Sequence, residues 1–160
     1  MPHAGRNLAP REFFATLNNY GVAPLAVSGE HCGSMTEYSQ TFLDHYRRPR
    51  NTGDLDKPDA VAIVHNDVCG DVLRFAINAE PDREPARRRI IAVRFKAYGC
   101  AATIAVASVI SEMVIGKRIG EIEKIGADEV VDALDGLPPG RIHAVVLGRA
   151  ALRDAISRLD

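Results

Sequence analysis

The chain has 160 residues, of which 46% are hydrophobic and 26% are charged, which is typical of one globular domain that buries a core. Lys and Arg number 20 against 21 Asp and Glu, so the formal net charge is −1, and Trp is absent. This charge balance argues against a protein that binds nucleic acid by neutralising phosphates, and the scarcity of aromatic residues argues against a stacking platform for single strands.

Three cysteines are too few for a disulfide-stapled secreted domain of this size. We therefore predict a reducing, cytoplasmic setting, in which thiols serve as ligands or nucleophiles. The longest apolar run, residues 101–110, has about half of the ~20 residues that a transmembrane helix needs. No membrane span is expected, and the N-terminal residues resemble neither a signal peptide nor a transit peptide.

Residues 1–34 carry Gly, Pro and Asn at close intervals and show no sustained hydrophobic period. This composition predicts a disordered extension. Structured patterning begins directly after Met35, which is an alternative candidate for the start of the protein. Residues 35–160 are therefore predicted to form the folded domain.

A helical pattern begins at Ser39. Strand-like runs follow at residues 60–65, 71–78 and 90–98, and the Pro- and Arg-rich segment 80–89 is predicted to be the exposed tip of a hairpin. Runs joined in this way form an antiparallel meander with one buried face. Four residues of the third run are expected on the buried face: Ile91, Val93, Phe95 and Ala97.

After Cys100 the pattern becomes helical. Residues 101–115 are apolar or small on nearly every side, which predicts a buried central helix. Shorter helices are predicted at 119–125 and 128–134, and a final amphipathic helix at about 142–159. One helix, three strands and then several helices predict an α+β fold, in which a three-stranded antiparallel sheet packs against the helices.

Four residues beside predicted turns or helix starts have the chemistry of metal ligands: Cys69, Asp71, Cys100 and His143. Gly70 permits a tight turn between the first two, although such a turn is commonly structural. Cys100 opens the central helix, whose dipole suits an anionic thiolate ligand. Together the four donors suit zinc or an iron–sulfur cluster, provided that the fold brings them to one point. The remaining histidines are interpreted as surface or loop residues: His3, His31, His45 and His65.

Several motifs resemble those of the IscU/NifU-type iron–sulfur cluster assembly scaffolds, over about residues 38–159. The matching segments are, in chain order, Asp44-His45-Tyr46 with Pro49-Arg50-Asn51-Thr52-Gly53, Cys69-Gly70-Asp71-Val72, Phe95-Lys96-Ala97-Tyr98-Gly99-Cys100, and Leu137-Pro138-Pro139 with Arg141-Ile142-His143.

The resemblance implies a SufE/NifU-like α+β fold and a scaffold or carrier protein, not an enzyme. Such a scaffold receives sulfur from a cysteine desulfurase, assembles a labile [2Fe–2S] cluster and transfers it to apo iron–sulfur proteins. The resemblance further implies a DnaK-class chaperone that recognises Leu137-Pro138-Pro139, although Gly140-Arg141 stands where chaperone-binding members have Val-Lys. A homodimer is left open.

One position departs from the family pattern. The family has a Cys directly after the His that opens the last helix, and this chain has Ala144 there. In the family that thiol is a cluster ligand and, in some members, the sulfur acceptor. Cys32, in the predicted extension, is not expected to replace it. Two functions are therefore weighed: a scaffold that holds the cluster with Cys69, Asp71, Cys100 and His143, or a zinc-bound, cluster-incompetent regulatory partner of a cysteine desulfurase.

Overall fold

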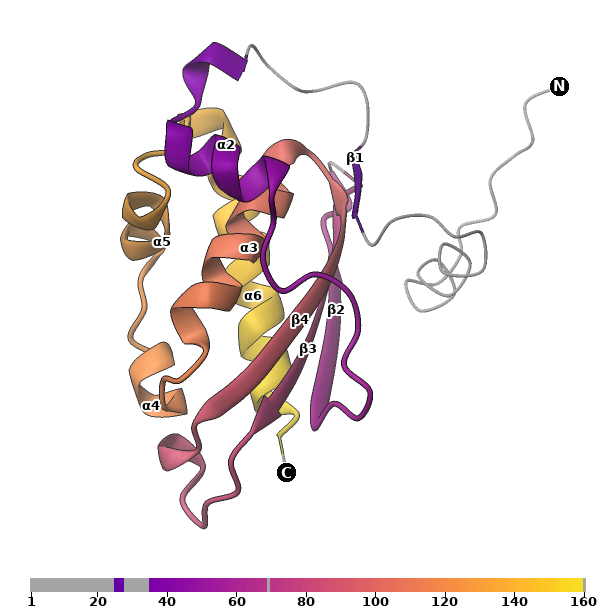
Figure 1. The fold of residues 1–160 in the computed structure, drawn as a ribbon, viewed down its shortest axis with the longest axis vertical. Coiled ribbons are helices and arrows are strands. Elements are labelled where there is room, and N and C mark those ends of the chain that lie inside the picture. Colours follow the sequence, from indigo (N-terminus) through magenta and orange to yellow (C-terminus); the bar gives the residue numbers. More distant parts are fainter. Residues whose placement is uncertain (1–24, 28–34, 69, 160) are drawn as a thin grey trace, which may run out of the picture.

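Three antiparallel strands form the centre of the fold in the computed structural model, which describes residues 25–27, 35–68 and 70–159 (Figure 1). These strands are β2 (Ala60–His65), β3 (Val72–Ala79) and β4 (Ile90–Gly99). β3 lies between β2 and β4 and pairs with both in antiparallel register. The predicted α+β fold with an antiparallel meander is thereby confirmed.

A fourth strand, β1 (Leu25–Val27), extends the sheet and runs parallel to β4. It lies within the segment predicted to be a disordered extension, so these three residues differ from that prediction. Three residues are too few to carry a detectable hydrophobic period, and their position depends on pairing with β4. Residues 1–24 and 28–34 lie outside the described residues, and the domain boundary at residue 35 stays a prediction.

The helices cover one face of the sheet (Figure 1). They are α2 (Gln40–Arg47), α3 (Ala101–Val114), α4 (Ile119–Ile122), α5 (Ala127–Ala133) and α6 (Ile142–Ser157). Single 3₁₀ turns lie at η1 (Met35–Glu37), η2 (Pro85–Arg87) and η3 (Pro139–Arg141). Ser39 caps α2, because its Oγ accepts a hydrogen bond from the N–H of Phe42 at 2.9 Å.

The core lies between the sheet and the two long helices, α3 and α6. Phe75 of β3 and Phe95 of β4 are fully buried, with ring centroids 6.1 Å apart. α3 packs against β4, α2 and α6, whereas α6 packs against β2 and β3. Nearly every residue of α3 is buried, which confirms the prediction of a central helix.

β4 begins at Ile90 as predicted, but the prediction that Ile91 lies on the buried face was wrong. Ile90 is fully buried and Ile91 is 51% exposed, although Ile91 was expected on the buried face with Val93. The pairing register shifts here, because Asn78 pairs with Ala92 but Ala79 pairs with Ile90. The extra residue in β4 is a bulge, which reverses the alternation of faces at that point.

Candidate metal centre

Three of the four predicted ligands meet at one end of the sheet. Asp71 directly precedes β3, Cys100 follows β4 as the N-cap of α3, and His143 lies in the first turn of α6. The start of β3, the end of β4 and the starts of both helices come together there (Figure 1). Segments that are far apart in the sequence therefore place a carboxylate, a thiol and an imidazole in one place.

The ligand atoms of these residues lie close enough to share one metal ion. Cys100 Sγ lies 3.9 Å from Asp71 Oδ2 and 3.9 Å from His143 Nε2. His143 Nε2 lies 3.6 Å from Asp71 Oδ2. One candidate atom from each residue thus falls within 4.8 Å of the others. Donor atoms that each bind at about 2.0–2.3 Å from a zinc or iron ion are separated by distances of this order.

A backbone contact orients the imidazole of His143. Its Nδ1 lies 3.2 Å from the carbonyl oxygen of Gly140. A carbonyl oxygen only accepts hydrogen bonds, so Nδ1 is the donor, and Nε2 is the nitrogen left to bind a metal. Nε2 is the nitrogen that faces Cys100 and Asp71. This support of a ligating histidine by a second partner is common in metal sites.

Asp71 is only 2% exposed, and two neighbouring residues fix the position of its carboxylate. The hydroxyl of Thr103 donates a hydrogen bond to Asp71 Oδ2 at 2.8 Å. On the other side lies Gly99, where an added Cβ would stand 2.5 Å from Asp71 Oδ1. The carboxylate therefore occupies space that only a glycine leaves free.

The turn before β3 also fixes the backbone of Asp71. The N–H of Asn66 donates to the carbonyl of Asp71 at 2.8 Å, and the N–H of Gly70 donates to the carbonyl of Asn66 at 2.7 Å. Gly70 has φ +71°, in the left-handed region that glycine adopts without strain. The turn between β2 and β3 thus sets where the carboxylate enters the site.

Thr103 was not identified from the sequence, and Gly99 was named only as a neighbour of Cys100, without a role of its own. Thr103 follows Cys100 by three residues, so both lie on the same side of the first turn of α3, and that spacing was the available signal. The close approach of Asp71 to Gly99 depends on the packing of β3 against β4, which the sequence pattern does not report.

Two further positions matter for the proposed site: Cys69, the fourth predicted ligand, and Ala144, which follows His143. Cys69 lies outside the described residues, so its role as a ligand stays a prediction. Ala144, next to His143 in α6, is fully buried. A larger side chain at position 144 therefore has to be accommodated by the surrounding core.

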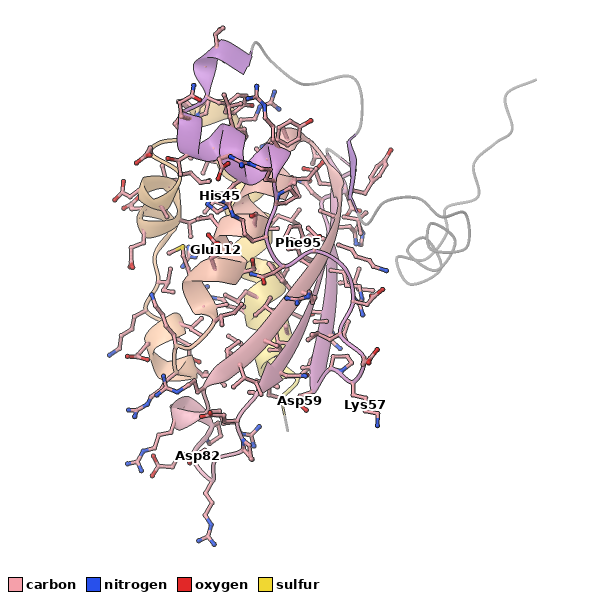
Figure 2. The ribbon with its side chains drawn as sticks, viewed as in Figure 1. His45, Lys57, Asp59, Asp82, Phe95 and Glu112 are labelled. Carbon is pink, nitrogen blue, oxygen red and sulfur yellow. The ribbon has the colours of Figure 1, made fainter. Side chains whose placement is uncertain are left out.

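A second polar cluster lies between α2 and α3 and corrects the interpretation of His45 as a surface or loop residue. His45 is only 6% exposed. Its Nδ1 lies 2.8 Å from Ser108 Oγ, which also accepts the N–H of Arg50 at 2.9 Å. Its Nε2 lies 3.7 Å from Glu112, and Figure 2 labels both side chains between the two helices. The i to i+3 spacing from the fully buried Phe42 placed His45 on the inner face of α2 and was the missed signal.

The electrostatics of this cluster favour a neutral His45. Burial, and after it the positive charge of Arg50, lower the pKa of His45 below its usual value, against an opposing effect of Glu112. Hydrogen bonds from Arg50 and then Arg48 lower the pKa of Asp44. The cluster thus joins α2 to α3 and to the segment that follows α2. His65, by contrast, lies at the end of β2 with a half-exposed side chain beside Asp67, as expected.

A family model described as the NifU-like N-terminal domain matches residues 37–160. The chain is 41% identical over 119 residues to the iron–sulfur cluster assembly scaffold protein IscU 1 of Archaeoglobus fulgidus, covering 74% of each chain. It is 37% identical over 125 residues to the IscU scaffold protein of Escherichia coli K12, covering 75% of this chain and 91% of the relative.

The fold is similar to the crystal structure of the N-terminal part of a nitrogen-fixing NifU-like protein from Brucella abortus. The TM-score is 0.58 at 21% identity, covering 76% of this chain and 92% of the other. Among the helices that the structure describes, none has the length and apolar character needed to cross a membrane.

Proposed function

Because the chain belongs to the family of NifU-like N-terminal domains, we propose that it is an iron–sulfur cluster assembly scaffold, which holds a labile cluster and passes it to apo-proteins. The observation that carries the proposal is the meeting of Asp71, Cys100 and His143, whose ligand atoms lie within 4.8 Å of one another. The cluster is the cargo of such a protein, so its function is assembly and transfer and not substrate turnover.

The donor set suits a cluster that is held briefly. We propose a [2Fe–2S] cluster, whose two irons take four protein ligands in all. Asp71, Cys100 and His143 supply three, and Cys69, two residues before Asp71 in the chain, is the proposed fourth. Thiolates bind iron–sulfur clusters strongly, whereas a carboxylate is a harder and weaker partner for them. Asp71 is therefore the ligand that gives way to the incoming thiolate of an acceptor.

The same donors favour a second candidate function. A thiolate, an imidazole and a carboxylate with one further donor also form a tetrahedral zinc site. We infer that Ala144 stands where the family pattern has a third cysteine, which removes one soft ligand and one sulfur acceptor. A zinc-bound protein with this site would act as a regulatory or interaction partner of a cysteine desulfurase without building clusters.

Anaerobic reconstitution with ferrous iron and sulfide separates the two functions. A scaffold gives a coloured protein with visible charge-transfer bands and matching amounts of iron and acid-labile sulfide. A regulatory zinc protein stays colourless and retains about one zinc, which matches one tetrahedral site. The variants Cys69→Ser and Cys100→Ser are each expected to lose the bound metal or cluster.

Cys32→Ser is the matched control, because it removes the only other thiol of the chain. It is expected to bind as much iron and sulfide as the unaltered protein. Loss of the cluster in Cys32→Ser, or full retention in both Cys69→Ser and Cys100→Ser, would contradict the proposed ligand set.

Restoring the family thiol gives a further test. After reconstitution of Ala144→Cys, the visible absorbance of the cluster is expected to bleach more slowly than in the unaltered protein. After incubation with a desulfurase and cysteine, mass spectrometry is expected to detect one added sulfur atom at position 144. Because Ala144 is fully buried, the added sulfur has a packing cost of about 1–3 kcal/mol. Thermal unfolding of the metal-free variant therefore has to accompany the measurement.

The proposed partners are a cysteine desulfurase and apo iron–sulfur proteins. A DnaK-class chaperone is a further proposed partner, through Leu137-Pro138-Pro139. This segment ends at Pro139, the first residue of η3 just before α6, and Pro139 is exposed. Replacing Pro139 with alanine is expected to weaken chaperone binding and to leave the metal content unchanged.

A further inference from the structure

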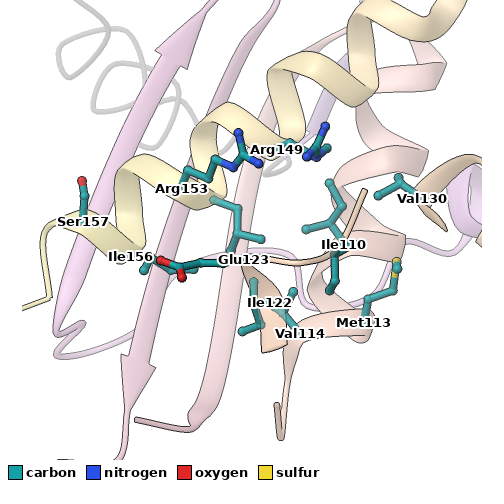
Figure 3. A pocket seen from close by; sticks show the side chains of 12 residues that line it. Ile110, Met113, Val114, Ile122, Glu123, Val130, Arg149, Arg153, Ile156 and Ser157 are labelled. Atoms are coloured by element: carbon teal, nitrogen blue, oxygen red, sulfur yellow. The ribbon is translucent and has the colours of Figure 1, made fainter. Parts of the chain in front are cut away.

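A pocket of about 430 Å³ lies between the helices, and none of the candidate metal ligands lines it. Figure 3 shows the side chains that do. α3 contributes Ile110 and Val114, and α6 contributes Leu152 and Ile156. Ile122 of α4 and Val130 of α5 also belong to the apolar lining, as do Met113 and Ile125. The volume falls within the range of roughly 300–1,000 Å³ that is usual for sites of small molecules.

Two cations stand at the edge of this apolar pocket. Arg149 and Arg153 are one turn apart on α6, so they lie on the same side of the helix. Arg149 is half-buried and Arg153 is exposed. Within the part of the chain that the structure describes, neither guanidinium makes a hydrogen bond or an ion pair. Glu123, from the opposite wall, is the one carboxylate among the lining residues.

This combination selects the class of ligand. An apolar cavity binds a hydrocarbon tail by excluding water from it. A guanidinium presents a planar set of donors that matches a carboxylate, and it is more weakly hydrated than an ammonium group. With two cations and one anion among the lining residues, the pocket keeps a positive excess that a single negative charge neutralises. A cationic amphiphile would meet repulsion from both arginines.

We propose that this pocket binds a small carboxylate with an apolar tail, such as a medium-chain fatty acid. The carboxylate lies between Arg149 and Arg153, and the tail lies among Ile110, Ile122 and Val130.

The proposed ligand contacts the two helices that also carry the candidate metal ligands. Cys100 precedes the first residue of α3 and His143 is the second residue of α6. At 1.5 Å per residue, the pocket residues of α3 lie roughly 15–20 Å from Cys100 along the helix. Along α6, Arg149 is six residues from His143, which is roughly 9 Å. None of the candidate metal ligands lines the pocket, so its occupancy can be measured on metal-free protein. Failure of this proposal leaves the proposed scaffold function unaffected.

The test uses the full chain, free of metal and labelled on the methyl groups of Ile, Leu and Val. Octanoate is expected to shift the methyl signals of Ile122 and Val130 saturably, with a Kd of about 1 mM or tighter, as suits a ligand of this size. Octylammonium has the same tail with a positive head, and butyrate has the same head with a short tail. Both are expected to bind much more weakly than octanoate.

Two double variants separate head-group recognition from net charge. Arg149→Gln with Arg153→Gln is expected to weaken octanoate binding about tenfold, the effect of losing a charge-assisted hydrogen bond. Arg83→Gln with Arg87→Gln makes the same change in charge at the exposed hairpin tip and is expected to bind octanoate like the unaltered chain. Glu123→Gln is expected to tighten binding, because it removes the anion that opposes the ligand.

Several results would overturn the proposal. These are the absence of saturation with octanoate, equal binding of octylammonium, and equal weakening in both double variants. A second copy of the chain is another occupant of such a pocket. If the methyl signals of Ile122 and Val130 shift with protein concentration in the absence of octanoate, and diffusion measurements show a dimer, the pocket is a self-association site and the proposal fails.

Discussion

Replacing Gly99 with alanine places a methyl group where the carboxylate of Asp71 now lies. The added Cβ would stand 2.5 Å from Asp71 Oδ1 and 2.8 Å from its Cγ. The first distance has to grow by roughly 0.9 Å to reach the 3.4 Å at which ordinary van der Waals contact begins. Asp71 cannot move freely, because it is buried and bonded to Thr103.

The expected cost has two components. Overpacking of a close-packed site costs about 1–3 kcal/mol, and a domain of this size loses roughly 2–4 °C in Tm per kcal/mol. The metal-free variant should therefore unfold at a temperature about 2–12 °C lower. Ligand distances in metal sites are expected to agree with the usual values within about 0.2 Å, so a displaced carboxylate is a poorer ligand. We expect zinc affinity to fall roughly 10–100-fold, as it does when the support of a ligand is lost.

Thermal unfolding of metal-free protein and competition for zinc with a chromophoric chelator measure the two effects. Gly140→Ala is the matched control, because a Cβ there meets no atom within 4 Å although the residue touches His143 through its carbonyl. The control is expected to keep both Tm and zinc affinity. If Gly99→Ala behaves like Gly140→Ala, Asp71 does not lie against Gly99 and is not a ligand held by packing.

Three further predictions follow from the same contacts. Asp71→Ala is expected to lower zinc affinity but to slow both the decay of a reconstituted cluster and its transfer to apo-ferredoxin, because the exchangeable ligand is gone; faster decay would contradict this role. Thr103→Val preserves shape but removes the hydrogen bond to the carboxylate, so unfolding of the metal-free protein should show a loss of about 1.5–3 kcal/mol, which zinc partly restores; an unchanged stability would show that the bond contributes nothing. The pKa of His45 is lower in the folded protein than its usual value of about 6.5 in the unfolded chain. As the pH falls below about 6.5, the imidazole is therefore protonated more readily in the unfolded chain, and the folded protein loses stability. At pH 5.5 this loss is at most about 1.4 kcal/mol. In His45→Gln, the difference in unfolding free energy between pH 7.5 and pH 5.5 should be smaller by up to that amount. An equal pH dependence in both proteins would mean that the pKa of His45 is not lowered by folding.

The order and type of the main elements followed from the sequence alone. A strand-like apolar run predicted β2, and apolar residues alternating with charged ones predicted β3 and β4. An all-round apolar segment predicted the buried helix α3. These features are local, because the period of a strand or helix is written in consecutive residues. The chemistry of the donors was equally readable, since Asp71, Cys100 and His143 were identified before their positions in space were known.

The tertiary structure decided what depends on pairing and packing between distant segments. The bulge that buries Ile90 and exposes Ile91 depends on the register between β3 and β4, and β1 exists as a strand only beside β4. The partners of His45 lie on α3, more than 60 residues further along the chain. A hydrophobic period states which face of an element is buried, but not which neighbour covers it.

The convergence of the candidate metal ligands has the same origin. Cys100 lies 29 residues from Asp71 and 43 from His143 along the chain, and no local pattern relates such separations to a distance. Their meeting depends on the antiparallel register that places the start of β3 beside the end of β4, and on α6 packing next to α3. The sequence by itself determined which side chains have the chemistry of metal ligands, whereas strand register and helix packing decided that the candidate atoms of three of them lie within 4.8 Å of one another.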